Sequence, residues 1–241
     1  MPVVAAACAA LLGALVGALV PRPAYRLSVP YGEPPRSGSE TSDDFPPGIR
    51  GWIALSGGTR PRRWLTVPAG ALAFGTLAWV LWPAPMLPVV LFVAGTGLLL
   101  APIDLAVLRL PDPLVAVAFA GAAGYLVVLA IVTGDYAALL RAVLAAAAMA
   151  GGYLLLALVP GGHLGLGDVK LAGVLGLVLG WFGWGFVLLG AVLPHLINGP
   201  TVLVLLATGR ARRGSSIPLG PALLVGAWLA VVLVLGWRRF G

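Results

Sequence analysis

Eight long apolar runs dominate this sequence, at residues 3–20, 67–82, 86–103, 113–133, 138–159, 169–182, 184–207 and 219–237. A helix rises about 1.5 Å per residue, so about 20 apolar residues cross the ~30 Å hydrocarbon core of a bilayer. Charged residues make up 10% of the chain, whereas soluble domains usually carry about 25%. These features predict an all-α, polytopic membrane helix bundle with about eight transmembrane helices.

One polar segment interrupts the apolar pattern. Residues 21–66 contain seven arginines, several prolines and the polar run 37–44. Such a composition buries little apolar surface, which predicts a loop with a disordered middle. We therefore expect a first transmembrane helix at 1–20, a loop at 21–66 and a helical core at 67–241. No basic segment precedes the first run, so we expect a retained helix and not a cleaved signal peptide.

The basic residues predict how the helices are oriented. If the amino terminus is outside, four segments face the cytoplasm, namely 21–66, 104–112, 160–168 and 208–218. These segments carry or adjoin most of the 15 Lys and Arg residues. This arrangement satisfies the positive-inside rule, although Arg238 and Arg239 fall outside and count against it. The net charge of +7 is thus typical of cytoplasmic loops in a multi-pass inner (plasma) membrane protein, and it does not indicate nucleic-acid binding.

Two aspartates lie at the edges of apolar runs. Asp168 follows the glycine-rich segment 161–167 and begins the sixth apolar run. Asp104 stands at the end of the third run, so two complete runs separate the two aspartates. Both are therefore expected on one side of the membrane, which the orientation makes cytoplasmic. Two carboxylates that share one proton can perform aspartic proteolysis, because one takes a proton from water while the other polarises the scissile carbonyl. The alternative is that they are helix N-caps or interface charges, and Asp168 stands where a cap would.

Three segments resemble motifs of the type IV prepilin peptidases, a family of Gly-x-Gly-Asp membrane aspartic proteases. They are residues 103–114 around the first aspartate, the Gly-x-Gly-Asp segment 165–171, and Ile-Pro-Leu-Gly-Pro at 217–221. The resemblance covers roughly residues 90–235. It implies a membrane-embedded aspartic endopeptidase that removes the short basic leader of prepilin-like precursors, cutting after a glycine and before a hydrophobic segment. It also implies that Asp104 and Asp168 are catalytic, supported by other motif residues, namely Gly165, Gly167, Lys170, Asp112 and Pro111.

The supporting residues also have simpler interpretations. Asp112 precedes Pro113, a pair that favours a turn before the next helix. Lys170 could neutralise Asp168 or bind a lipid phosphate, and we weigh these against a role toward the substrate. Gly176 and Gly180, four residues apart, are expected to allow close helix contact.

The histidines and the cysteine predict no metal site. His163 is expected in a loop, and His195, inside an apolar run, is expected to hydrogen-bond a helix. Cys8 is the single cysteine. Many members of the type IV prepilin peptidase family, which this sequence resembles, carry two Cys-x-x-Cys pairs in the first cytoplasmic loop. We therefore expect no cofactor. N-methylation from S-adenosylmethionine, which accompanies that loop in the larger enzymes, becomes doubtful.

A function of another class remains open. Paired intramembrane carboxylates also carry protons or cations in small transporters and assembly subunits. The broken helices at matching positions that transporters often show are not evident here. The expected partners are prepilin-like precursors and membrane lipid.

Overall fold

The computed structural model describes residues 1–29, 63–159, 164–207 and 218–240. Within these ranges the chain is helical and contains no strand. The elements are α1 Pro2–Leu19, α2 Pro21–Leu27, α3 Arg63–Leu81, α4 Leu87–Val107, α5 Asp112–Thr133, α6 Tyr136–Leu158, α7 Leu166–Phe182, α8 Trp184–Ala207 and α9 Gly220–Phe240. Each of the eight expected runs corresponds to one helix, so the prediction of an all-α bundle is confirmed.

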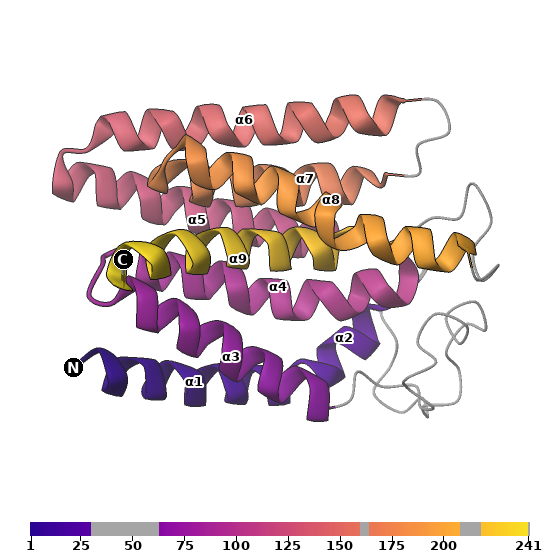
Figure 1. Cartoon of the computed structure of the whole chain (residues 1–241), viewed down its shortest axis with the longest axis horizontal. Coiled ribbons are helices and arrows are strands. Elements are labelled where there is room, and N and C mark those ends of the chain that lie inside the picture. The colour runs from indigo at the N-terminus through magenta and orange to yellow at the C-terminus, as the bar shows by residue number, and fades with distance from the viewer. Residues whose placement is uncertain (30–62, 160–163, 208–217, 241) are drawn as a thin grey trace.

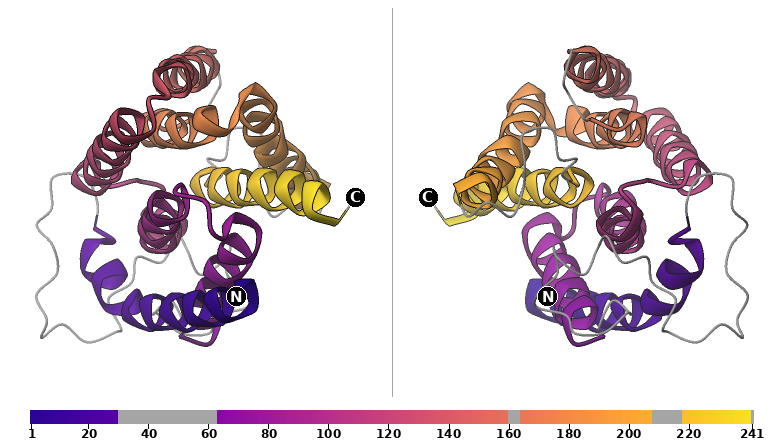
Figure 2. Two further views of the ribbon diagram at one scale, coloured as in Figure 1. Left: turned by 90° about the vertical axis from the view of Figure 1, so that its left-hand side faces the viewer. Right: turned by 90° about the vertical axis from the view of Figure 1, so that its right-hand side faces the viewer.

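Six of the described helices are long and apolar enough to cross a membrane, namely α1, α3, α4, α5, α6 and α9. Helix α7 has 17 residues, and the apolar part of α8 spans Trp184–Pro200. Figure 1 shows the long helices side by side along the long axis of the molecule. The two end-on views show α1, α2 and α3 on one side of α4 and α9, and α5 to α8 on the other (Figure 2).

The first part of the expected loop is helical. Helix α2 follows α1 directly, because Val20 at the junction keeps right-handed helical dihedral angles and proline is well suited to the first turn of a helix. Val20 and Ala24 are buried against Ile103 near the end of α4, which is why this short segment is ordered. Residues 30–62, which contain the polar run at 37–44, lie outside the described part of the chain, and α3 begins at Arg63.

Small residues allow two pairs of helices to approach closely. A Cβ atom on Gly176 would lie 2.6 Å from the carbonyl oxygen of Ala145, and one on Gly180 would lie 2.5 Å from the Ala145 Cβ. Gly13 of α1 and Gly70 of α3 meet in the same way, since a Cβ added to either glycine would lie 2.1 Å from the carbonyl oxygen of the other. The expected contact through Gly176 and Gly180 is confirmed, and its partner is α6.

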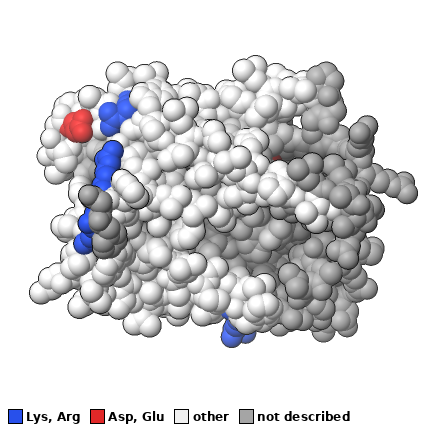
Figure 3. Space-filling model, in the orientation of Figure 1, with Lys and Arg blue, Asp and Glu red and all other residues white. Residues whose placement is uncertain are grey.

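Arginines at the end of the bundle near the carboxyl terminus bind backbone or aromatic groups. Arg141 donates to the carbonyl oxygens of Gly180 and Trp181 at 2.8 and 2.7 Å, which satisfies acceptors at the end of α7. Arg239 donates to the Trp79 carbonyl and lies over the Trp79 ring. In Figure 3 most of the charged atoms on the visible described surface lie at this end, and a further basic group lies at the bottom of the view. Arg238 lies over the Phe186 ring, so both basic residues that counted against the orientation have structural partners.

Candidate active site

Asp104 lies in the last turn of α4 and is 4% exposed. Its Oδ2 accepts a hydrogen bond of 3.0 Å from the backbone N–H of Gly220, the first residue of α9. The first N–H groups of a helix lack partners within the helix and favour a negative charge nearby. Because Asp104 is at the end of α4, it is not the N-cap of its own helix, but its side chain satisfies the first N–H group of α9.

Gly220 leaves no room for a side chain. A Cβ atom at this position would lie 2.7 Å from Asp104 Oδ2 and 3.1 Å from its Cγ. The backbone of α9 reaches the carboxyl group only because the residue is glycine. The Ile-Pro-Leu-Gly-Pro segment therefore contributes directly to the environment of Asp104, a role that the sequence did not predict for Gly220.

Asp168 lies in the first turn of α7 and is 7% exposed. The backbone N–H of Gly165, the N-cap residue, donates to its carboxyl group. This is the position from which an acidic side chain commonly reaches back to the N-cap N–H, so Asp168 supports the helix start without being the N-cap itself. Its Oδ1 is buried and has no hydrogen-bond partner within the described residues.

The two carboxyl groups lie at the same end of the bundle. Helix α4 ends there and α7 begins there, with α5 and α6 forming one complete hairpin between them (Figure 1). Asp104 and Asp168 interact electrostatically. The structure thus brings together two side chains that are 64 positions apart in the sequence, as the count of intervening spans predicted.

Gly167 brings the connection between α4 and α5 against the start of α7. A Cβ atom on Gly167 would lie 3.0 Å from the Cβ of Leu110, which is buried. Leu108 caps α4 in a left-handed conformation, and Pro111 precedes α5 as its extended N-cap. The glycine of the Gly-x-Gly-Asp motif and the Leu-Pro segment of the first motif are therefore in direct contact. At Gly165 a Cβ would make only ordinary contacts.

Lys170 pairs with Asp112 and not with Asp168. Its Nζ lies 2.7 Å from Asp112 Oδ1, and both side chains are exposed. This ion pair joins α7 to the first residue of α5. Of the interpretations weighed for Lys170, neutralisation of Asp168 is therefore not the one that the structure shows. The physical reason is that Asp168 is buried, with its carboxyl group bonded to the Gly165 backbone, whereas Asp112 is exposed. Asp112 and Pro113 do begin a helix, as predicted.

Tyr153 interacts with Asp168 through its electrostatic field, although nothing in the sequence singled it out. It is buried on α6, its hydroxyl donates to the Ala191 carbonyl at 3.3 Å, and it interacts electrostatically with Asp168. The His195 ring packs against it, with 5.6 Å between ring centroids. His195 Nδ1 is 2.9 Å from the same carbonyl oxygen, which confirms the expected hydrogen bond to a helix and shows that the helix is its own. His163 lies outside the described residues.

The comparison with protein families matches this arrangement. Residues 89–207 match the sequence profile of the type IV leader peptidase family. The chain belongs to this family. The matched region runs from α4 to α8 and contains both aspartates with their motif residues, while Gly220 lies beyond it.

No curated protein and no solved structure matches the chain in the corresponding comparisons. Membership in the leader peptidase family makes the protein a peptidase in general terms. Within the described ranges, no group of three or more His, Cys, Asp or Glu residues is gathered that could hold a metal ion.

Proposed function

We propose that this leader peptidase family member is a membrane aspartic endopeptidase that removes the basic leader of type IV prepilin-like precursors. The observation that carries the proposal is the pair of buried carboxyl groups, Asp104 and Asp168, which interact at one end of the bundle. In this proposal that end faces the cytoplasm and the protein is a multi-pass protein of the inner membrane. The positive-inside count of the sequence supports this orientation.

The proposed chemistry uses the two carboxyl groups as one unit that holds a single proton. The ionised member takes a proton from a water molecule, whose oxygen attacks the scissile carbonyl carbon while the protonated member donates to the carbonyl oxygen. Collapse of the tetrahedral intermediate breaks the C–N bond as a proton passes to the leaving nitrogen. The Gly220 and Gly165 N–H groups hold one side of each carboxyl group. Asp168 Oδ1 is buried and has no protein partner in the described chain, and the proposal assigns it to the attacking water or the substrate carbonyl.

The test of this function is co-expression with a candidate prepilin. We expect a gel shift that corresponds to loss of the leader, with cleavage after a glycine and before the apolar segment. An intact precursor in every case, together with proton- or cation-dependent transport by the purified protein in vesicles, would favour the transporter alternative. Family membership favours proteolysis.

A second activity is not part of the proposal. The loop 21–66 contains no cysteine, so the metal-binding cysteines that accompany methylation in larger enzymes have no equivalent in it. We expect no cofactor, and processed substrate should carry a free, unmethylated amino terminus. Mass spectrometry of a substrate processed with S-adenosylmethionine supplied checks this, and a product heavier by one methyl group would contradict it.

A further inference from the structure

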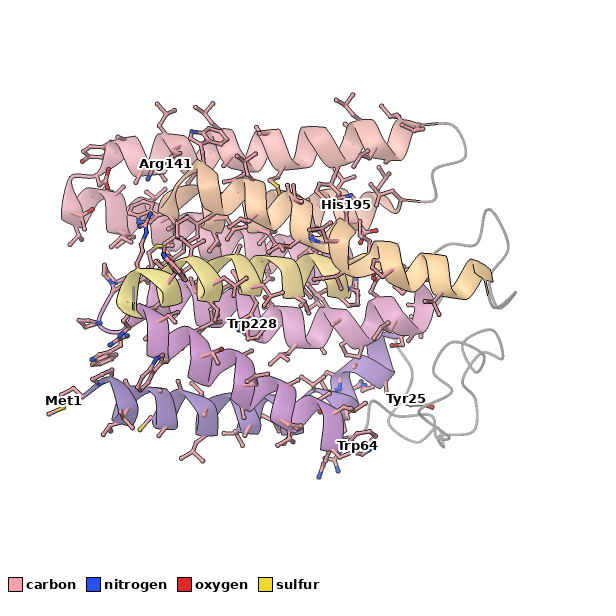
Figure 4. The ribbon with its side chains drawn as sticks, in the orientation of Figure 1. Met1, Tyr25, Trp64, Arg141, His195 and Trp228 are labelled. Atoms are coloured by element: carbon pink, nitrogen blue, oxygen red, sulfur yellow. The ribbon has the colours of Figure 1, made fainter. Side chains whose placement is uncertain are left out.

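An apolar cavity of about 310 Å³ lies between α3, α4, α7 and α9. Its lining consists of aliphatic residues, glycine, proline and the indole of Trp228, whose Nε1 donates to Thr76 Oγ1 at 3.0 Å. Trp228 therefore links α9 to α3 across the cavity, and Figure 4 shows it in the middle of the bundle. No charged side chain contributes to the walls.

The residues that line the cavity lie on the same helix faces as the two aspartates. On α4 it is lined by Val90, Ala94, Gly97 and Ala101, and Asp104 continues this spacing of three and four residues, which marks one face of a helix. Ala101 precedes Asp104 by three residues, or about 4.5 Å along the axis. The cavity therefore begins about one turn from the Asp104 carboxyl group.

The same relation holds on the other two helices of the site. On α7 the lining residues Leu175 and Val178 follow Asp168 by seven and ten positions, which places them on one face of the helix. On α9 the lining begins at Pro221, directly after the Gly220 that binds Asp104. Three helices thus connect the walls of the cavity to the carboxyl pair.

One side of the cavity opens to the surroundings of the bundle. Leu72 of α3 and Val225 of α9 line it and are 57% and 42% exposed, whereas Leu77, Leu179 and Val231 on its inner walls are buried. Because α3 and α9 are both candidate membrane spans, the opening between them faces the lipid.

We propose that this cavity receives apolar side chains from one face of the substrate's hydrophobic segment, the part that follows the scissile bond. The proposal rests on the proposed leader-peptidase function. A helix of about 20 residues is about 30 Å long and at least about 10 Å wide, far larger than the cavity, so the segment would lie in lipid against α3 and α9. In lipid, packing complementarity drives helix association. With the first turn of the segment at Ala101 and Pro221, the preceding bond would lie at the aspartates.

Photocrosslinking tests this placement without requiring catalysis. The probe is a synthetic precursor with a basic leader that ends in glycine, followed by about 20 apolar residues, long enough to span the bilayer. A photoreactive side chain replaces Leu72 in the full-length Asp168→Asn variant in membranes. The matched control carries it in place of Val117, which is similarly exposed on α5 and does not line the cavity. We expect adducts with the apolar segment from position 72 and at least about tenfold fewer from position 117.

Filling the cavity gives a second measurement in the same assay. Ala73→Phe places a ring into it from α3, which carries neither aspartate, whereas Ala120→Phe adds the same ring to an exposed position of α5. We expect Ala73→Phe to lower the crosslinking yield from position 72 about tenfold and Ala120→Phe to leave it unchanged. If Ala73→Phe does not accumulate in membranes, Ala69→Phe at the exposed rim of the cavity replaces it.

Equal yields from positions 72 and 117, or adducts of position 72 with lipid alone, would overturn the proposal. So would an unchanged yield in the filled variant. Cleavage of the same probe by the wild-type chain is measured separately. Failure of that reaction would reject the proposed function, while the crosslinking pattern would still decide whether the cavity binds the apolar segment.

Discussion

At the scale of single residues, each aspartate of the candidate site accepts a hydrogen bond from one backbone N–H group. Gly220 donates to Asp104 and Gly165 donates to Asp168. Each carboxyl group is buried, and a buried carboxylate needs such donors to offset the loss of hydration. This leaves Asp168 Oδ1 as a buried acceptor without a partner among the described groups.

Replacement of either aspartate tests the proposed chemistry. We expect Asp104→Asn and Asp168→Asn each to abolish leader removal while membrane insertion persists, because asparagine keeps the shape but cannot share a proton. The gel-shift assay with a prepilin measures the loss. Asp135→Asn is the control, since Asp135 caps α6 through Ala138 N–H and asparagine caps helices equally well. Complete processing by either of the first two variants would remove that aspartate from the catalytic pair.

Gly220→Ala tests the contact between α9 and Asp104. The added methyl group would lie 2.7 Å from Asp104 Oδ2, so the carboxyl group or the helix must move. Because small misplacements in a catalytic site are costly, we expect cleavage to fall about 10- to 100-fold. Gly236→Ala on the same helix is the control, since a Cβ there meets nothing within 4 Å. Equal activity of the two variants would show that this contact does not matter.

At the scale of helices, the ion pair between Lys170 and Asp112 joins α5 to α7. Its side chains are exposed, so water and salt screen the attraction, and such pairs contribute about 0.2–1 kcal/mol to stability. The contact between Gly167 and Leu110 lies between the same two segments. Together these contacts connect the polypeptide after Asp104 to the helix that carries Asp168.

A double-mutant cycle measures this connection. We expect Asp112→Asn and Lys170→Gln each to lower the free energy of unfolding by less than about 1 kcal/mol. The double variant should be no less stable than either single variant, because each substitution breaks the same ion pair. Thermal unfolding in detergent and the cleavage rate are the measurements. If Lys170→Gln abolished cleavage while Asp112→Asn had no effect, Lys170 would act on substrate or lipid and not through the ion pair.

At the scale of the whole molecule, the helices alternate in direction. In Figure 1, α4 ends and α7 begins at one end of the bundle, whereas α6 begins and α9 ends at the other. The carboxyl pair therefore lies at the first end, and Arg141, Arg238 and Arg239 lie at the second. The apolar surface between the two ends is what a membrane-embedded bundle presents to lipid. The orientation proposed above therefore predicts different accessibility for the two ends.

Cysteine labelling tests this orientation. In a Cys8→Ala background, which removes the single native cysteine, Leu166→Cys lies at the start of α7 and Tyr136→Cys at the start of α6, both at exposed positions. We expect an impermeant thiol reagent to label the Tyr136→Cys variant in intact cells, and the Leu166→Cys variant only after permeabilisation. The reverse pattern would place the carboxyl pair on the outer side.

The sequence by itself determined where the helices lie along the chain and that the two aspartates share one end of the bundle. Apolar runs long enough for a bilayer leave the backbone no other way to satisfy its N–H and C=O groups in lipid. The number of runs between Asp104 and Asp168 then fixes whether they share an end. Both inferences depend on length and order along the chain, which a sequence contains.

Only the tertiary structure decided which groups touch. The N–H of Gly220 reaches Asp104 across 116 positions, Lys170 pairs with Asp112, and Tyr153 packs against His195 and bonds the Ala191 carbonyl. These helices are apolar on nearly every side, so their periodicity does not mark the face that packs inward. Which helices become neighbours depends on how closely small residues and large side chains fit across each interface, and that fit exists only in the folded bundle.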